Sequence, residues 1–192
     1  MGVQKMKSGV GVPCAEESDV KNANAGEGTV MVGVLSDTHG RLPMAACAAL
    51  ADCDAIVHAG DICGLDILTE LRSLAPVHAV LGNNDFPEYG SGVQRFAQFE
   101  LAGLRFLVAH YPQDIRSALR GNGPIHPGDP LPHVCIHGHT HVPEILTGKD
   151  ARPANLIVCP GSVSRPRGGS KPSIAKMEVE NGRILSVRIE EI

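Results

Sequence analysis

The chain has 192 residues, of which 43% are hydrophobic, and this is enough for one compact domain with a substantial buried core. A formal net charge of -4 argues against a protein that binds nucleic acid or an anionic membrane through a basic face, although nucleotide-sized substrates remain open. The apolar stretches are far short of the roughly 20 residues that cross a bilayer, and the N-terminus lacks the apolar core of a secretory signal, so we expect a cytoplasmic protein with no membrane partner.

Residues 1–29 are rich in Gly, Ser, Asn, Glu and Lys without a sustained apolar period, which predicts a flexible N-terminal tail. The folded domain is expected to span residues 30–192. Apolar runs then alternate with helical segments, with strands predicted over 30–35, 55–58 and 77–81 and helices over about 43–51 and 65–74. This alternation predicts βαβ units around a mostly parallel, buried sheet.

The second half of the chain consists mainly of predicted strands, over 93–101, 104–109, 134–137, 144–147, 156–159, 174–180 and 183–190. Ala102-Gly103 joins the first pair, and the last pair flanks Asn181-Gly182, which is a strong hairpin signal. Residues 121–132 are dense in Gly and Pro and predict an irregular surface loop. The expected architecture is a layered α/β sandwich of two sheets with helices outside.

Metal-binding side chains follow the first three predicted strands. Asp37 and His39 follow the first strand and, in an extended turn, would point the same way as two ligands of one cation. Alone, this pair is better explained by an Asp that caps a helix beside a solvated His. Asp61 follows the second strand and can offer both oxygens to bridging metals. Asn83 follows the third strand, where an ordinary Asn and Gly turn is the alternative.

Histidines follow two later strands. His110 ends the strand over 104–109, and His137, His139 and His141 alternate after the strand that begins at residue 134. Alternating residues of an extended segment project to one side, and several imidazoles on one face are costly unless a metal or an acid relieves their crowding. A surface His tract is the alternative. His137 is expected at the same strand end without being a ligand.

Five strand ends thus each offer a metal-competent oxygen or imidazole, and five independent coincidences are improbable. The cysteines are not part of this set and form no CxxC pair: Cys14, Cys47, Cys53, Cys63, Cys135 and Cys159. Nitrogen and oxygen ligands without thiolates suit Mn, Fe or Zn.

The blocks DTHG, HAGD, GNND, AH and HGHTH, in this order, resemble the D-x-H, G-D, G-N-[HCN]-[DE], H and G-H-x-H signature of the calcineurin-like metallophosphoesterase superfamily. They span residues 37–141. The later PGSVSRPR stretch, residues 160–167, makes the chain most similar to small bacterial and archaeal phosphodiesterases of the YfcE type. The resemblance implies an α/β/β/α sandwich of two mixed sheets flanked by helices, and hydrolysis of phosphoester bonds.

The resemblance also implies a two-metal centre. The first metal would be held by Asp37, His39 and His141, the second by Asn83, His110 and His139, and Asp61 would bridge them. Two divalent ions are expected, with Mn²⁺ as the first choice and Fe, Zn or Ni as alternatives. A hydroxide shared by the two metals would attack phosphorus in line.

Several residues depart from the wider pattern or support the ligands. Asn84 stands where many members of the superfamily carry a His, and an amide cannot protonate a leaving group, so Asn84 is expected to bind the phosphate and the general acid is in doubt. Asp85 would orient the Asn83-Asn84 turn. His58 is a candidate substitute acid, but a structural strand residue is the stronger reading. Cys159 stands where related chains commonly carry Asn.

The expected partner is a small phosphoester substrate, and a homo-oligomer is left open. Arg165 and Arg167 of the PGSVSRPRGG stretch are candidates for contacting the substrate, against the alternative of a plain Gly and Pro loop. The main hypothesis is a phosphodiesterase. The alternatives are a phosphomonoesterase, a dinucleoside polyphosphate hydrolase, or a protein-binding scaffold like the retromer subunit of this fold. All seven ligand positions carry competent residues, which counts against the scaffold.

Overall fold

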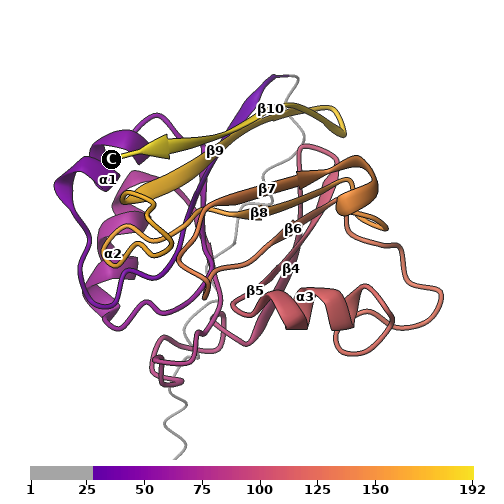
Figure 1. The fold of residues 1–192 in the computed structure, drawn as a ribbon, viewed down its shortest axis with the longest axis horizontal. Coiled ribbons are helices and arrows are strands. Elements are labelled where there is room, and N and C mark those ends of the chain that lie inside the picture. Colours follow the sequence, from indigo (N-terminus) through magenta and orange to yellow (C-terminus); the bar gives the residue numbers. More distant parts are fainter. Residues whose placement is uncertain (1–27) are drawn as a thin grey trace, which may run out of the picture.

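The structure is a computed structural model and describes residues 28–192 (Figure 1). Most of the predicted N-terminal tail, residues 1–29, lies outside that range, so its flexibility and the domain boundary at residue 30 stay predictions. Within residues 28–192, no helix has the length and apolar character needed to cross a membrane.

Three parallel strands form the first half of one sheet, as the alternating pattern predicted. β1 (Val30–Leu35), β2 (Ala55–His58) and β3 (Val77–Ala79) are connected through α1 (Met44–Leu50) and α2 (Leu65–Leu74). The antiparallel strands β9 (Ser173–Glu180) and β10 (Arg183–Glu191) complete the sheet in the order β10-β9-β1-β2-β3.

The second sheet has the order β4-β5-β6-β8-β7. Its strands are β4 (Phe96–Leu101), β5 (Leu104–Ala109), β6 (Val134–Ile136), β7 (Glu144–Thr147) and β8 (Leu156–Cys159). β5, β6 and β8 are parallel, and the edge strands β4 and β7 are antiparallel to their neighbours. Both sheets are therefore mixed, as expected.

The elements stack in four layers (Figure 1). α1 and α2 cover the outer face of the first sheet, and α3 (Pro112–Ala118) covers the outer face of the second. Val32 and Val34 of β1 point into the core between the sheets, whereas Leu35 packs with the helices. Because both faces of β1 are buried, its sequence is an uninterrupted apolar run. The α/β/β/α sandwich is confirmed.

Several details differ from the sequence-based expectations. β3 ends at Ala79 rather than at residue 81, and Val80 pairs with Gln94 in an isolated parallel bridge. β4 begins at Phe96 rather than at residue 93. α3 and a short 3-10 turn, η1 (Gly148–Asp150), were not predicted.

The two predicted hairpins are present, and their turns touch. Ala102 and Gly103 have φ values of 47° and 76°, and Asn181 and Gly182 have φ values of 47° and 75°. Two successive left-handed residues are what a two-residue hairpin loop requires. The backbone amide of Gly182 donates a hydrogen bond to the Ala102 carbonyl at 2.6 Å. The two sheets are therefore joined at the edge where β1 and β5 begin.

Candidate metal centre

The parallel strands of both sheets end at one edge, and the polar residues that follow them meet there. Backbone hydrogen bonds connect these strand ends within each sheet: the Asp37 amide donates to the Gly60 carbonyl at 2.9 Å, and the Gly138 amide donates to the His110 carbonyl at 3.0 Å. Ligand sites gather at such carboxyl edges of parallel strands. The same edge therefore collects side chains from widely separated parts of the chain.

Glycines allow the two sheets to come this close. A Cβ atom on Gly138 would lie 2.8 Å from Asp37 Oδ2 and 2.9 Å from the Ala59 carbonyl oxygen. A Cβ atom on Gly60, whose φ is 92°, would lie 2.7 Å from His110 Nδ1. These positions therefore need glycine for space, and Gly60 needs it for its backbone conformation as well.

One group of ligand atoms comes from Asp37, His39, Asp61 and His141. All four atoms lie within 4.8 Å of one another. His141 Nε2 is 3.1 Å from Asp37 Oδ1, and His39 Nε2 is 3.4 Å from His141 Nε2. The four residues are buried or half-buried, so water has little access to their polar atoms.

A second group adjoins the first through Asp61. Asn83 Oδ1 lies 3.0 Å from both His110 Nε2 and His139 Nδ1. Asp61 Oδ1 is 3.6 Å from His110 Nε2, and Asp61 Oδ2 is 3.7 Å from His39 Nε2. Each oxygen of Asp61 thus faces a different group of ligand atoms.

The hydrogen bonds of two histidines fix which ring nitrogen carries the proton. His141 Nδ1 lies 2.6 Å from the Arg165 carbonyl oxygen, and His110 Nδ1 lies 2.8 Å from the Ala59 carbonyl oxygen. A carbonyl oxygen can only accept, so Nδ1 is the donor in each contact, and in the neutral form of each ring Nε2 presents a lone pair. These lone pairs point at Asp37 Oδ1 and at Asn83 Oδ1, which are also acceptors.

Acceptors that face acceptors in a buried site are stable when a cation lies among them. Asp37 Oδ1 shows this directly, because it is buried and has no hydrogen-bond partner within residues 28–192. The residues therefore fit a metal centre. Oxygen and imidazole ligands without thiolates are the set that divalent Mn, Fe or Zn accepts.

Burial also shifts the pKa values of the ligands. It raises the pKa of Asp37 to about 6, although hydrogen bonds from Ser36 Oγ at 2.6 Å and from the His139 amide at 3.1 Å favour the carboxylate. Burial lowers the pKa of His39, His139 and His141, which keeps these rings neutral at pH 7. Neutral imidazole is the form that binds metals.

Asn84 and Asp85 adjoin the ligands without belonging to the four-residue cluster. The Asn84 amide donates to Asp61 Oδ1 at 2.8 Å, and Asn84 Nδ2 donates to Asp61 Oδ2 at 2.6 Å. Asp85 accepts hydrogen bonds from the backbone amides of Ile62, Cys63 and Gly82. Burial opposes the charge of Asp85, but these amides hold its pKa below the ordinary value. Asp85 thus fixes the turn that carries Asn83 and Asn84.

Two further histidines lie outside the cluster. His58 is fully buried, with Nδ1 accepting from the Gly60 amide at 3.2 Å and Nε2 lying 3.0 Å from Thr38 Oγ1. Burial lowers the pKa of His58 to about 4, so the ring is neutral and engaged at both nitrogens. His137 faces α3 and Glu144 on the outer side of the second sheet.

The expectation that alternation in an extended segment aligns the ligands was wrong. Asp37, His39, His139 and His141 have φ values of 54°, 46°, 68° and 60°, so each ligand turn is tightly coiled with left-handed residues. Such φ values are uncommon outside glycine and cost energy. The surrounding hydrogen bonds, rather than strand alternation, hold these side chains in one place.

Sequence reasoning missed the serines and the tyrosine that support the ligands. Ser162 Oγ and Ser164 Oγ both donate to the Asp37 carbonyl, at 2.8 Å and 3.0 Å, and Ser36 Oγ donates to Asp37 Oδ2. The Tyr111 ring lies 4.5 Å from the His139 ring. Pro112 at the first turn of α3 was an available signal for the helix. Serines in a Gly and Pro loop give no sequence signal of a supporting role.

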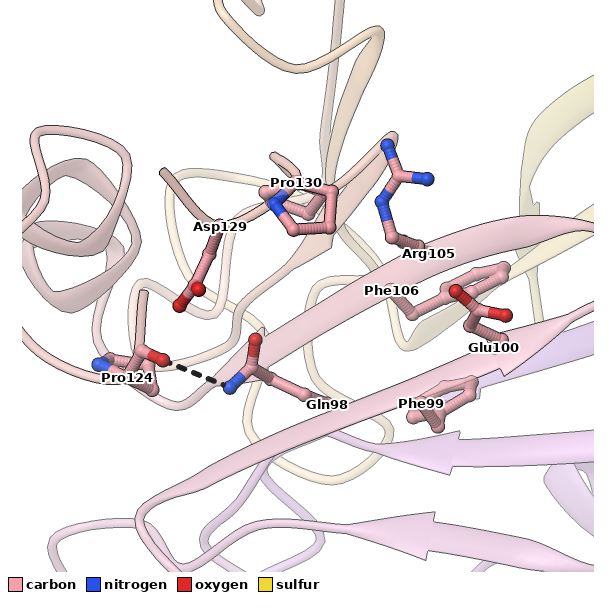
Figure 2. Close-up of a pocket in the computed structure, with 9 residues that line it drawn as sticks. Gln98, Phe99, Glu100, Arg105, Phe106, Pro124, Asp129 and Pro130 are labelled. Atoms are coloured by element: carbon pink, nitrogen blue, oxygen red, sulfur yellow. Dashed lines mark hydrogen bonds between the residues drawn. The ribbon is translucent and has the colours of Figure 1, made fainter. Parts of the chain in front are cut away.

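The predicted 121–132 loop does not border the metal centre. Pro124, Asp129 and Pro130 of this loop line a hollow of about 290 Å³ on the outer face of the β4–β5 hairpin, together with Gln98 and Arg105 (Figure 2). Gln98 Nε2 donates to the Pro124 carbonyl at 3.2 Å and ties the loop to β4 (Figure 2). Arg105 is near the start of β5, whereas His110 follows its end.

Comparison with known proteins agrees with this geometry. Residues 30–182 match the calcineurin-like phosphoesterase superfamily domain. A probable metallophosphoesterase of Methanothermobacter thermautotrophicus is 36% identical over 163 residues, which cover 81% of this chain and 89% of that protein.

Two solved structures show the same fold. YfcE, a phosphoesterase from E. coli, matches with a TM-score of 0.57 and 22% identity over 82% of this chain and 98% of that one. Zinc-complexed Vps29 from Entamoeba histolytica matches with a TM-score of 0.62 and 20% identity over 84% of this chain and 98% of that one.

Proposed function

The chain belongs to the calcineurin-like phosphoesterase superfamily and is a metal-dependent hydrolase, and on that premise we propose that it cleaves phosphodiesters at a centre of two divalent cations. The observation that carries the proposal is the convergence of unprotonated ring nitrogens on carboxylate and amide oxygens. Asp37, His39 and His141 would hold one cation, Asn83, His110 and His139 would hold the other, and Asp61 would contact both.

When bound, two such cations supply positive charge to the phosphoryl oxygens and lower the pKa of water toward neutrality. The protein residues orient the centre. The Arg165 and Ala59 carbonyls fix the His141 and His110 rings, and the amides around Asp85 fix the Asn83-Asn84 turn. Asn84 Nδ2, next to Asp61, is placed to donate a hydrogen bond to a phosphate oxygen.

None of these groups is a good proton donor for the leaving group. Asn84 has no acidic proton, and burial lowers the pKa of His39, His139 and His141. We therefore propose that substrates with good leaving groups are cleaved faster than alkyl esters. His58 is not available as a donor because both of its nitrogens are engaged in the core.

Mn²⁺ is the cation that we propose first, since imidazole and oxygen ligands suit it, with Fe, Zn or Ni as alternatives. A phosphomonoesterase or a dinucleoside polyphosphate hydrolase would use the same centre. The fold shared with Vps29 raises a protein-binding role as the competing class, but the cluster of Asp37, His39, Asp61 and His141 supports catalysis.

The test is a hydrolysis assay of the metal-depleted protein reloaded with Mn²⁺, Fe²⁺, Zn²⁺ or Ni²⁺. The panel contains bis(p-nitrophenyl) phosphate, p-nitrophenyl phosphate, an alkyl phosphodiester and a dinucleoside polyphosphate. We expect Mn²⁺ to restore activity, the aryl diester to react fastest, and EDTA to abolish turnover. Undiminished activity after prolonged dialysis against EDTA would contradict the proposal.

A further inference from the structure

Hydrogen bonds hold the segment that follows β8, Pro160–Ser170, against the metal centre. Ser36 Oγ donates to the Gly161 carbonyl at 2.8 Å, while Ser162 Oγ and Ser164 Oγ donate to the Asp37 carbonyl. Gly161 and Ser162 are buried. The first half of this segment is therefore fixed against the strand end that carries Asp37.

The second half of the segment is fastened to His141. The His141 ring donates from Nδ1 to the Arg165 carbonyl at 2.6 Å, and the Arg167 amide donates to the His141 carbonyl at 3.1 Å. The backbones of Arg165 and Arg167 are thus each hydrogen-bonded to His141, a proposed metal ligand.

Both guanidinium groups are left without a carboxylate. Arg165 and Arg167 are exposed, and in the part of the chain that the structure describes neither side chain forms an ion pair or a hydrogen bond. Elsewhere on the surface, Arg95 binds Asp114 at 2.8 Å and Arg188 binds Glu190 at 2.7 Å.

The two arginines carry positive charge that a simple phosphodiester would leave unneutralised. Two divalent cations, the carboxylates of Asp37 and Asp61 and a bridging hydroxide would together carry a net charge of about +1. The single negative charge of a phosphodiester balances this, so the charges of Arg165 and Arg167 remain. A guanidinium that is free of carboxylates beside such a centre is suited to a further phosphate, which it can bind in a bidentate manner.

We propose that Arg165 and Arg167 bind a second phosphate group of the substrate, so that the preferred substrates are nucleotide-like phosphodiesters or phosphoanhydrides that carry another phosphate near the scissile one. The proposal rests on the proposed function of the metal centre. It makes the two arginines specificity-determining residues.

Equilibrium binding tests the proposal without turnover. Isothermal titration calorimetry on the manganese-loaded full chain compares thymidine 5′-phosphate with thymidine 5′-diphosphate and thymidine 3′,5′-bisphosphate. We expect at least one of the two-phosphate ligands to bind about 10-fold more tightly or better, as a charge-assisted hydrogen bond allows. Arg165→Gln, Arg167→Gln and the double variant should reduce this ratio toward one.

Arg183→Gln is the matched control, because Arg183 is also exposed but lies at the start of β10, at the opposite edge of the sheet. It should leave the ratio unchanged. Metal content and melting temperature of every variant are measured alongside, so that a loss of folding is not taken for a loss of binding.

A kinetic arm separates this proposal from the proposed function. Thymidine 5′-(p-nitrophenyl phosphate) and its 3′-phosphorylated form share one scissile bond and one leaving group. If the protein hydrolyses neither ester, this result contradicts the phosphodiesterase assignment but not the arginine proposal. The arginine proposal is overturned if no two-phosphate ligand binds more tightly than thymidine 5′-phosphate, or if the preference survives in the double variant.

Discussion

The protonation of single side chains decides what this centre can bind. Because His141 and His110 donate from Nδ1 to backbone carbonyls, their Nε2 lone pairs are committed to the centre. Asp37 Oδ1 is buried and has no donor among the residues that the structure describes, so it also requires a cation. A buried carboxylate is costly without a cation, and this predicts how the metal-free protein responds to pH.

Asp37→Asn should stabilise the metal-free protein at neutral pH. A folded pKa of about 6, raised from 3.8, means that the carboxyl group stabilises the fold below pH 4 and that this contribution is lost as pH rises through 6. The loss is about 3 kcal/mol. Urea unfolding in EDTA should therefore show the Asn variant gaining that much over the natural protein between pH 4 and pH 7.5.

His58 titrates in the opposite sense over the same range, because its pKa falls to about 4 on folding, so its contribution is present above pH 6.5 and lost as pH falls through 4. Both proteins contain His58, so their difference isolates Asp37. With Mn²⁺ at pH 7.5, the natural protein should be more stable to urea than the Asp37→Asn variant. A difference that does not vary with pH would contradict the burial argument.

Asp61→Asn should cut turnover by at least about two orders of magnitude, because each carboxylate oxygen faces a different ligand group and both cations lose charge compensation. Elemental analysis should show less than two metals per chain. Circular dichroism should show an intact fold. A variant with full metal content and normal kcat would rule out a bridging role.

Asn84→Ala should have a smaller effect. If Asn84 contributes one hydrogen bond to a charged phosphate, its loss costs about 1.5–3 kcal/mol, or roughly 10–150-fold in kcat/KM. Metal content should stay normal. A loss of metal would instead show that Asn84 acts through the hydrogen bond from its side-chain Nδ2 to Asp61.

At the scale of elements, the centre depends on how closely two strand ends approach. Gly138→Ala would place a Cβ atom 2.8 Å from Asp37 Oδ2 and 2.9 Å from the Ala59 carbonyl oxygen, neither of which can move freely. We expect weaker metal binding and a loss of about 1–3 kcal/mol of stability. Gly92→Ala, with no atom within 4 Å of the added Cβ, is the control. Equal metal affinity in the two variants would contradict the steric argument.

The elements that the sequence predicted well are those with buried apolar runs. β1, β2, α2 and β5 have the expected bounds because their pattern is set by burial on both faces or along one face. α3 was missed because it is one short segment between His110 and a Gly-rich loop. The bridge between Val80 and Gln94 depends on a contact between the sheets that no local pattern reveals.

The sequence predicted that the candidate ligands lie together because metal-competent side chains follow the strand ends, but the prediction gave the wrong reason for their alignment. The left-handed conformations of Asp37, His39, His139 and His141 arise from hydrogen bonds between segments distant in sequence. Ser162 and Ser164 were missed for a similar reason, since they donate hydrogen bonds to the Asp37 carbonyl, which is distant in sequence.

At the scale of the whole molecule, the centre joins two sheets that are covered separately by helices (Figure 1). Asp37, Asp61 and Asn83 follow strands of the first sheet, whereas His110, His139 and His141 follow strands of the second. Ligand binding to the folded state adds to stability by mass action. Removal of the metals should therefore lower the melting temperature by about 5–15 °C, measured by differential scanning calorimetry with and without EDTA. An unchanged melting temperature would mean that the ligands bind no cation.

The hydrogen bond between the two hairpin turns has a consequence for how the molecule opens. Gly182 and Ala102 hold the sheets together at the edge opposite the ligands, so chelation leaves this attachment in place. Hydrogen–deuterium exchange should then show a gradient along each strand. On adding EDTA, amides at the carboxyl ends of β1, β2 and β5 should exchange faster, while those beside the turns keep their protection. Uniform acceleration from one edge to the other would show that the sandwich loosens as a single unit.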